Sequence, residues 1–289
     1  MPVIRPARSI AVGVDLGATR LRLLALQQGR RVGRISTAAP PSSDLAKFLH
    51  GVWKARGWKR RDVGALVVAS RGIWTARERY ALAGQFTRLA TRVEVLSDAQ
   101  AALLGALGDT PGVLILSGTG SIVIGRDAGG RWARAGGLGP LLGDEGSAFW
   151  IGRAWLRATT HGEGFLPVRR LVTRKDAVAR IAGLAPSVLA RARRGDRGAR
   201  AIVGDAQSHL ASLAGDVVRQ LCLPRPVMVS WAGGVLDDPR FREGLKRAVA
   251  KNGLGARWRA PIAAPVAAAV ALAQRTLGTL PGALGKRVL

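Results

Sequence analysis

Residues 10–27 read IAVGVDLGATRLRLLALQ and contain two apolar, β-rich segments with a glycine between them. Gly17 interrupts the first segment and the second begins at Arg20, which is the pattern of two strands joined by a tight loop. A turn at 28–30 leads to a third strand over 31–37, so the chain opens with a β-meander. Further strands are predicted over 63–69 and 93–97, and helices over about 43–56, 75–91 and 99–107. This order of elements predicts an α/β fold.

The same order begins again in the second half of the chain. Residues 108–112 read GDTPG and are the best candidate for a linker. A second meander is predicted over 113–116, 122–125 and 131–135. A β-meander at the start of each half is a weak internal repeat, and it predicts two similar domains. The remaining elements are expected at 147–160, 170–222, 239–251 and 263–277 for helices and at 227–231 for a strand.

The charge of the chain is strongly positive, with 45 basic against 18 acidic residues and a net charge of +27. Only seven of the 45 are lysines, so 45 − 7 = 38 are arginines. Arginine, alanine and glycine are abundant together, as a GC-rich coding sequence would produce, and the basic residues are spread along the whole chain. We therefore expect solvated basic faces rather than a specific nucleic-acid site.

The length and amino-acid composition of the chain exclude several classes of protein. The 289 residues are enough for two domains, each with its own core. No uncharged apolar stretch is long enough for a membrane helix, and Asp15 ends the first apolar run too early for a signal peptide. A single cysteine, Cys222, excludes an internal disulfide framework and fits a reduced, cytoplasmic compartment.

Two loops between strands have the composition of phosphate-binding turns. Gly17 lets backbone N–H groups approach a phosphate, Thr19 adds a hydroxyl, and Asp15 at the strand end can hold a hydrated Mg²⁺. The loop SGTGS at 117–121 has two glycines and three hydroxyls and could form a second cradle. Each loop could also be a plain hairpin turn, although two such loops, one in each half, support each other.

Three acidic residues stand at predicted helix starts. Asp144 and Glu145 end the glycine-rich loop 136–146, where they could cap the next helix or bind the hydroxyls of a polyol. Asp98 follows the strand 93–97, where it could cap a helix or take a proton from an attacking hydroxyl.

In chain order, these motifs resemble the sugar-kinase/actin/heat-shock ATPase superfamily. Within it they are similar to the branch of N-acetylglucosamine kinases, bacterial glucosamine kinases and BadF/BadG/BcrA/BcrD-type ATPases. The most specific signal is GGLGPLLGDEGS at 136–147, with GTGS at 118–121 before it. DLGAT at 15–19, SDAQAAL at 97–103 and AGGV at 232–235 accompany it, so the resemblance extends from about residue 10 to 275.

The resemblance implies two ribonuclease-H-like domains of the actin-like ATPase type, with ATP in a cleft between them. The N-terminal domain would comprise 1–109 and 266–289, and the C-terminal domain 110–265 with a helical insertion. Asp98 matches the catalytic base, and Mg²⁺ would accompany ATP. The nucleotide would be bound by Gly17, Ala18, Thr19, Gly118, Thr119, Gly120, Ser121, Gly233 and Gly234.

The resemblance also implies a sugar site with departures from the family pattern. Asp144 matches a ligand of sugar hydroxyls, and Glu145 would then cap the helix. Ile122 stands where the N-acetylglucosamine kinases carry asparagine, and Leu138, next to Gly139, where they often carry tryptophan. Both changes remove polar or stacking groups, which puts N-acetylglucosamine itself in question. Ser70 and Arg71 replace a small glycine-rich turn and are further substrate candidates.

The function implied is an ATP-dependent phosphotransferase acting on a hydroxyl of a sugar or amino sugar, in a homodimer without nucleic-acid or membrane partners. The alternative is a BadF-type ATPase that activates a reductase or dehydratase. Such activators hold an iron–sulfur cluster with cysteines at a subunit interface, and the lone Cys222 argues against that chemistry.

Overall fold

The computed structural model describes residues 9–17, 19–160 and 164–278, and these residues form two compact units. Unit 1 consists of the described residues up to Gly108 together with those from Ile262 onward, and unit 2 of the described residues between Asp109 and Pro261. Within the described ranges, no helix is both long and apolar enough to cross a membrane.

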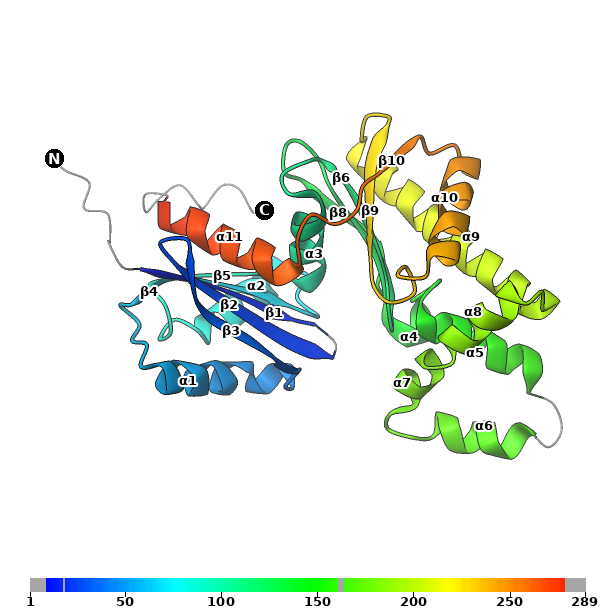
Figure 1. The fold of residues 1–289 in the computed structure, drawn as a ribbon, viewed down its shortest axis with the longest axis horizontal. Coiled ribbons are helices and arrows are strands. Elements are labelled where there is room, and N and C mark those ends of the chain that lie inside the picture. Colours follow the sequence, from blue (N-terminus) through cyan, green and yellow to red (C-terminus); the bar gives the residue numbers. More distant parts are fainter. Residues whose placement is uncertain (1–8, 18, 161–163, 279–289) are drawn as a thin grey trace. The chain divides into compact units, whose positions relative to one another are not determined.

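Unit 1 is built on a five-stranded sheet of order β3-β2-β1-β4-β5 (Figure 1). The first three strands pair antiparallel, and β1, β4 and β5 pair parallel. Their alternating side chains supply two apolar faces, one covered by α1 and α2 and the other by α3 and α11. The elements are β1 (Ile10–Leu16), β2 (Arg20–Gln27), β3 (Arg30–Ala38), η1 (Ser42–Asp44), α1 (Leu45–Arg56), β4 (Val63–Ser70), α2 (Ala76–Gly84), β5 (Arg92–Ser97), α3 (Asp98–Leu107) and α11 (Pro265–Gly278).

Unit 2 repeats this plan with a sheet of order β10-β9-β6-β7-β8. Helix α9 packs on β6, β7 and β8, and α5, α8 and α10 pack on α9 around one apolar core. The elements are β6 (Gly112–Ser117), β7 (Ser121–Arg126), β8 (Trp132–Gly136), α4 (Gly139–Leu142), α5 (Ala148–Thr159), α6 (Phe165–Val172), α7 (Ala177–Ala182), α8 (Ala185–Arg193), α9 (Arg197–Leu221), β9 (Val227–Ala232), α10 (Pro239–Lys251) and β10 (Ala256–Trp258).

The α/β class and the repeated meander are confirmed, because both sheets contain three antiparallel strands followed by parallel ones in the same spatial order. The helix predicted over 75–91 is too long. It ends at Gly84, and a series of tight turns then buries Phe86 completely and Leu89 almost completely. The short elements α4 and β10 were not predicted, since three or four residues carry too little periodicity.

Candidate functional site

Parallel strands of unit 1 bring two carboxylates to one edge of the sheet. The register pairs Asp15 of β1 with Ala69 of β4, and Ser70 of β4 with Ser97 of β5. Asp98 follows β5 directly as the first residue of α3. Carboxyl ends of parallel strands meet at one edge, which is where ligands bind in open α/β sheets. The predicted base and the predicted metal ligand therefore belong to one cluster.

Asp98 is not the cap of its helix. The cap is Ser97, whose Oγ accepts a hydrogen bond from Gln100 N at 3.1 Å, while Gln100 Oε1 accepts one from Ser97 N at 3.0 Å. Asp98 Oδ1 accepts from the adjacent Ala99 N at 2.8 Å. Burial raises the pKa of Asp98, and the Ala99 hydrogen bond and the charge of Arg71 act in the opposite direction. A half-buried carboxylate of raised pKa suits general base catalysis.

Asp15 is a buried carboxylate, and within the described part of the chain its one side-chain partner is the guanidinium of Arg22 at 3.4 Å. Burial raises the pKa of Asp15 to about 6; the Arg22 charge lowers it, and the negative charge of Asp98 raises it further. A bound cation would stabilise the ionised form of this buried carboxylate. Mg²⁺ typically takes one or two carboxylates together with phosphate oxygens and water, so the residues present fit it. Among the described residues, no three His, Cys, Asp or Glu side chains cluster as a metal cage.

The raised pKa of Asp15 predicts a pH-dependent stability. The folded state holds this proton more tightly than the unfolded chain, whose aspartate pKa is 3.8, so stability falls as the pH rises from about 4 to about 6. Asp15→Asn should therefore raise the free energy of unfolding at about pH 7.5 by up to about 3 kcal/mol, and much less at about pH 4.5. Urea unfolding of both proteins at the two pH values measures this, and an equal gain at both would contradict it.

Arg71 holds the first loop in place. Its Nη1 donates to Gly17 O, its Nη2 to Pro40 O at 3.5 Å, and its backbone N to Leu16 O at 3.2 Å. The neighbouring Ser70 is buried, and its hydroxyl donates to Arg71 O. The proposed substrate residues Ser70 and Arg71 thus hydrogen-bond backbone oxygens of unit 1, and Arg71 positions the loop.

The loop after β1 is a tight hairpin in the residues that the structure describes. Gly17 N donates to Arg20 O at 3.0 Å, and Ala39 N donates to Thr19 O at 3.0 Å. Thr19 is exposed at this turn. Ala18, also predicted to contact the nucleotide, lies outside the described residues.

In unit 2, three predicted motifs converge on the loop between β6 and β7. Its carbonyls at Gly118 and Thr119 accept from the first two amides of α5, Ala148 N at 2.8 Å and Phe149 N at 3.2 Å. Ser117 Oγ and Ser121 Oγ donate to the carbonyls of Gly146 and Glu145, at 2.8 and 2.7 Å. The loop is therefore fixed on the DEGS segment, although the two are far apart in the sequence.

The backbone amides of Thr119 and Gly120 have no hydrogen-bond partner among the described residues, whereas Gly118 N donates to Gly120 O at 2.9 Å. These two unpaired N–H groups at a glycine turn can donate hydrogen bonds to phosphate oxygens.

The turn after β9 lies against the same loop. Gly233 has a positive φ of 99°, and a Cβ there would lie 2.3 Å from Ser117 O. Val235 N donates to that carbonyl at 3.1 Å, and Gly234 has open space around it. Only glycine allows this contact, so AGG and GTGS form one surface of unit 2.

Asp144 contacts the loop between β6 and β7 at Ser121 and Gly120. It has a φ of 62°, it is 7% exposed, and its Oδ1 accepts from Ser121 N at 3.2 Å. Burial raises the pKa of Asp144, the Ser121 hydrogen bond lowers it, and Glu145 raises it. A Cβ on Gly120 would lie 2.9 Å from Asp144 Oδ2. Gly120 therefore leaves room for the Asp144 carboxylate, whose Oδ2 accepts no hydrogen bond from the residues that the structure describes.

The expectation that Glu145 caps α5 is wrong. Ser147 is the cap, because its Oγ accepts from Trp150 N at 3.0 Å, and α5 has no acidic residue in its first turn. The sequence does indicate Ser147 as the cap, since a serine directly before an apolar helix is a common N-cap.

The corrected cap gives a stability prediction. Ser147→Ala should destabilise the protein by about 1 kcal/mol, because Trp150 N loses its partner in the buried cap. Glu145→Gln, the matched neighbour, should change stability by less than about 0.5 kcal/mol. Thermal unfolding compares the two variants, and the reverse order would restore the capping role to Glu145.

The remaining sugar-site candidates of unit 2 are Leu138, Gly139 and Ile122, and they differ in environment. Leu138 is 63% exposed, and Gly139 begins the short α4 with a φ of 80°. Ile122 packs against Gly137, where a Cβ would lie 2.8 Å from its Cδ1. Sequence reasoning missed Arg22, which pairs with Asp15, because alternation in β2 does not distinguish one exposed arginine from another.

Comparisons with known proteins show the family of this chain. The model of the BadF/BadG/BcrA/BcrD ATPase family matches residues 12–273. N-acetyl-D-glucosamine kinase of Dictyostelium discoideum is 26% identical over 262 residues, which cover 76% of this chain and 82% of that protein. N-acetylmuramic acid/N-acetylglucosamine kinase of Clostridium acetobutylicum is 45% identical over 67 residues, and the match spans only 22% of that protein.

Solved structures show the same two-domain fold. A candidate N-acetylglucosamine kinase from Chromobacterium violaceum is 25% identical and has a TM-score of 0.66, with 93% of this chain and 100% of that chain covered. The hexokinase of the ROK type from Thermus thermophilus, at 16% identity and a TM-score of 0.59, covers 91% of this chain and 98% of its own. The predicted fold class, that of actin-like ATPases, is confirmed.

Proposed function

Because the chain belongs to the BadF/BadG/BcrA/BcrD ATPase family, we propose that it is an ATP-dependent kinase that phosphorylates a hydroxyl of an amino sugar. The observation that carries this proposal is the position of Asp98. Its carboxylate is half-buried at the edge of the parallel strands, and it does not cap helix α3. The similarity to N-acetylglucosamine kinases over most of the chain supports the sugar class.

The proposed reaction is an in-line phosphoryl transfer. The sugar hydroxyl oxygen attacks the γ-phosphorus of ATP, and the bond from that phosphorus to the β–γ bridging oxygen breaks, so that ADP leaves. Asp98 takes the proton of the attacking hydroxyl. Such reactions need mainly positioning and charge neutralisation, which N–H groups at Thr119 and Gly120 would provide for phosphate oxygens.

Mg²⁺ would be held at Asp15, where it would neutralise phosphate charge. In the free protein, Arg22 lies 3.4 Å from this carboxylate and lowers its pKa, against the effect of burial. Arg71 would keep the Gly17 loop in the conformation that approaches the nucleotide, through its bonds to Gly17 and Pro40. Gly17 and Thr19 would face the phosphates from unit 1.

The sugar would be recognised by Asp144 in unit 2. Its Oδ1 is engaged with Ser121 N, which leaves Oδ2 to accept a hydroxyl of the substrate. Ile122 and the exposed Leu138 offer apolar contacts where the family has polar or stacking groups, so we expect an amino sugar whose substituents differ from those of N-acetylglucosamine.

A coupled assay of ADP release with a panel of hexoses and hexosamines tests the proposal. The panel should include glucosamine, N-acetylglucosamine and N-acetylmuramic acid, each with ATP and Mg²⁺. We expect at least one amino sugar to stimulate ADP release well above the basal rate. Steady basal hydrolysis without stimulation by any sugar would instead favour an ATPase that activates a reductase or dehydratase.

A further inference from the structure

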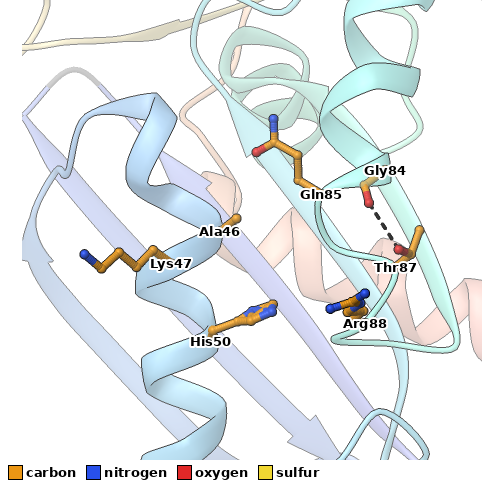
Figure 2. A pocket seen from close by; sticks show the side chains of 7 residues that line it. All are labelled: Ala46, Lys47, His50, Gly84, Gln85, Thr87 and Arg88. Carbon is orange, nitrogen blue, oxygen red and sulfur yellow. Dashed lines mark hydrogen bonds between the residues drawn. The ribbon is translucent and has the colours of Figure 1, made fainter.

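A pocket of about 340 Å³ lies in unit 1 between helix α1 and the turn after α2. Its walls are made by Ala46, Lys47, His50, Gly84, Gln85, Thr87 and Arg88. Figure 2 shows His50 and Arg88 on opposite sides of this pocket, with the imidazole directed toward Arg88. None of these residues belongs to the motifs above, and none lies at the strand ends that carry Asp15 and Asp98.

The charge in this pocket is not balanced. Its walls contain a lysine, a histidine and an arginine but no carboxylate. Within the described ranges, the side chains of Lys47, His50 and Arg88 have no hydrogen-bond or ion-pair partner. Two further pockets also contain arginines, and there one arginine each is paired, Arg22 with Asp15 and Arg193 with Asp238. The other arginines of those pockets have no ion-pair partner within the described ranges, but neither pocket contains a histidine or a lysine beside them. The pocket between α1 and the turn after α2 therefore offers unpaired basic side chains to an anion.

The two walls of the pocket are tied to each other. Trp53, one turn after His50 on α1, donates from Nε1 to Leu89 O at 2.8 Å, next to Arg88. Arg60 Nε donates to Thr87 O at 2.9 Å, and Phe86 between the wall residues is fully buried. The backbones that carry His50 and Arg88 are therefore fixed, which lowers the entropy lost when a ligand binds.

We propose that this pocket binds the phosphate group of a small phosphorylated molecule. The guanidinium of Arg88 offers a planar pair of donors that matches two phosphate oxygens, and His50 donates from the opposite wall. Lys47 adds positive charge from the same helix face, and the Gln85 amide adds a neutral donor. The site is separate from the catalytic cluster, so it does not depend on the function proposed above.

The imidazole signals of the protein give a local readout for binding. The chain has three histidines, so His50 can be identified in an NMR spectrum by its loss in His50→Gln. The probes are inorganic phosphate, a hexose 6-phosphate and the same hexose without phosphate, at constant pH and ionic strength. We expect both phosphates to shift the His50 signal until it saturates, and the hexose to leave it unchanged. His209, which lies against Trp150 in unit 2, is the internal control.

Arg88→Gln should weaken the binding of both phosphates by about tenfold or more, because a charged donor pair is lost. Arg30→Gln, at an exposed arginine that begins β3, is the matched control and should bind as the wild type does. Equal affinity for both phosphates would identify the phosphate group alone as the ligand, and tighter binding of the hexose 6-phosphate would add a sugar contact. No saturable shift of His50, or unchanged binding in Arg88→Gln, would overturn the proposal.

Discussion

Replacing Asp98 with asparagine is expected to lower the turnover of the phosphoryl transfer by about 10²–10⁴-fold, the usual contribution of a general base. Asparagine keeps the size of the side chain but cannot take the hydroxyl proton. It should not unfold α3, because Ser97 and Gln100 form the capping box without Asp98. Affinity for ATP should stay close to that of the wild type, since no phosphate ligand is removed.

Glu94→Gln is the matched control for this experiment. Glu94 lies on the same strand, β5, and burial raises the pKa of its carboxyl as it does for Asp98. It lies three residues before Ser97, the last residue of the strand, so it should not reach the reacting atoms. We expect normal turnover for Glu94→Gln, measured by ADP release with circular dichroism as a test of folding. Normal turnover of a folded Asp98→Asn protein would remove the base role.

Asp144→Ala is expected to raise the KM for the sugar by about 10–150-fold, because a charged hydrogen-bond partner is worth about 1.5–3 kcal/mol. Affinity for ATP should change little. Glu145→Ala should leave the sugar KM close to normal, since the hydrogen bond from Glu145 to the loop is made by its backbone carbonyl, which the substitution keeps. If Glu145 controls the sugar KM and Asp144 does not, the two roles are exchanged.

The contact between Gly120 and Asp144 sharpens this test. Gly120→Ala should displace the Asp144 carboxylate, which lies 2.9 Å from the added Cβ, and so raise the sugar KM as well. In an Asp144→Ala background the same substitution should cost far less, because its obstacle is gone. Additive effects in this double-mutant cycle would mean that Gly120 acts on the nucleotide alone.

Much of the fold could be predicted from local patterns. Alternation and glycine breaks identified β1, β2, β6 and β7, and the repeated meander indicated two similar sheets. The end of α2 could not be predicted, because the buried positions of Phe86 and Leu89 depend on contacts with residues distant in the sequence. The core overrides the helical pattern there.

The residues of the candidate site could be proposed from the sequence, but the contacts between them could not. A capping box of the form Ser-x-x-Gln at 97–100 is visible in the sequence and could have separated Asp98 from capping at once. The hydrogen bond from Ser121 N to Asp144 joins residues 23 positions apart, which no local pattern reports. The same holds for Arg71, which reaches the carbonyl of Gly17 across 54 positions.

Direct detection of the product tests most sharply whether this protein is a sugar kinase that uses Asp98. The protein is incubated with ATP, Mg²⁺ and the amino sugar that most stimulates ADP release, and the mixture is followed by ³¹P NMR. We expect a phosphomonoester signal to grow in equal amount to ADP with the wild type and with Glu94→Gln, and to be nearly absent with Asp98→Asn. ADP accompanied only by inorganic phosphate, or an equal phosphomonoester signal from Asp98→Asn, would contradict this assignment.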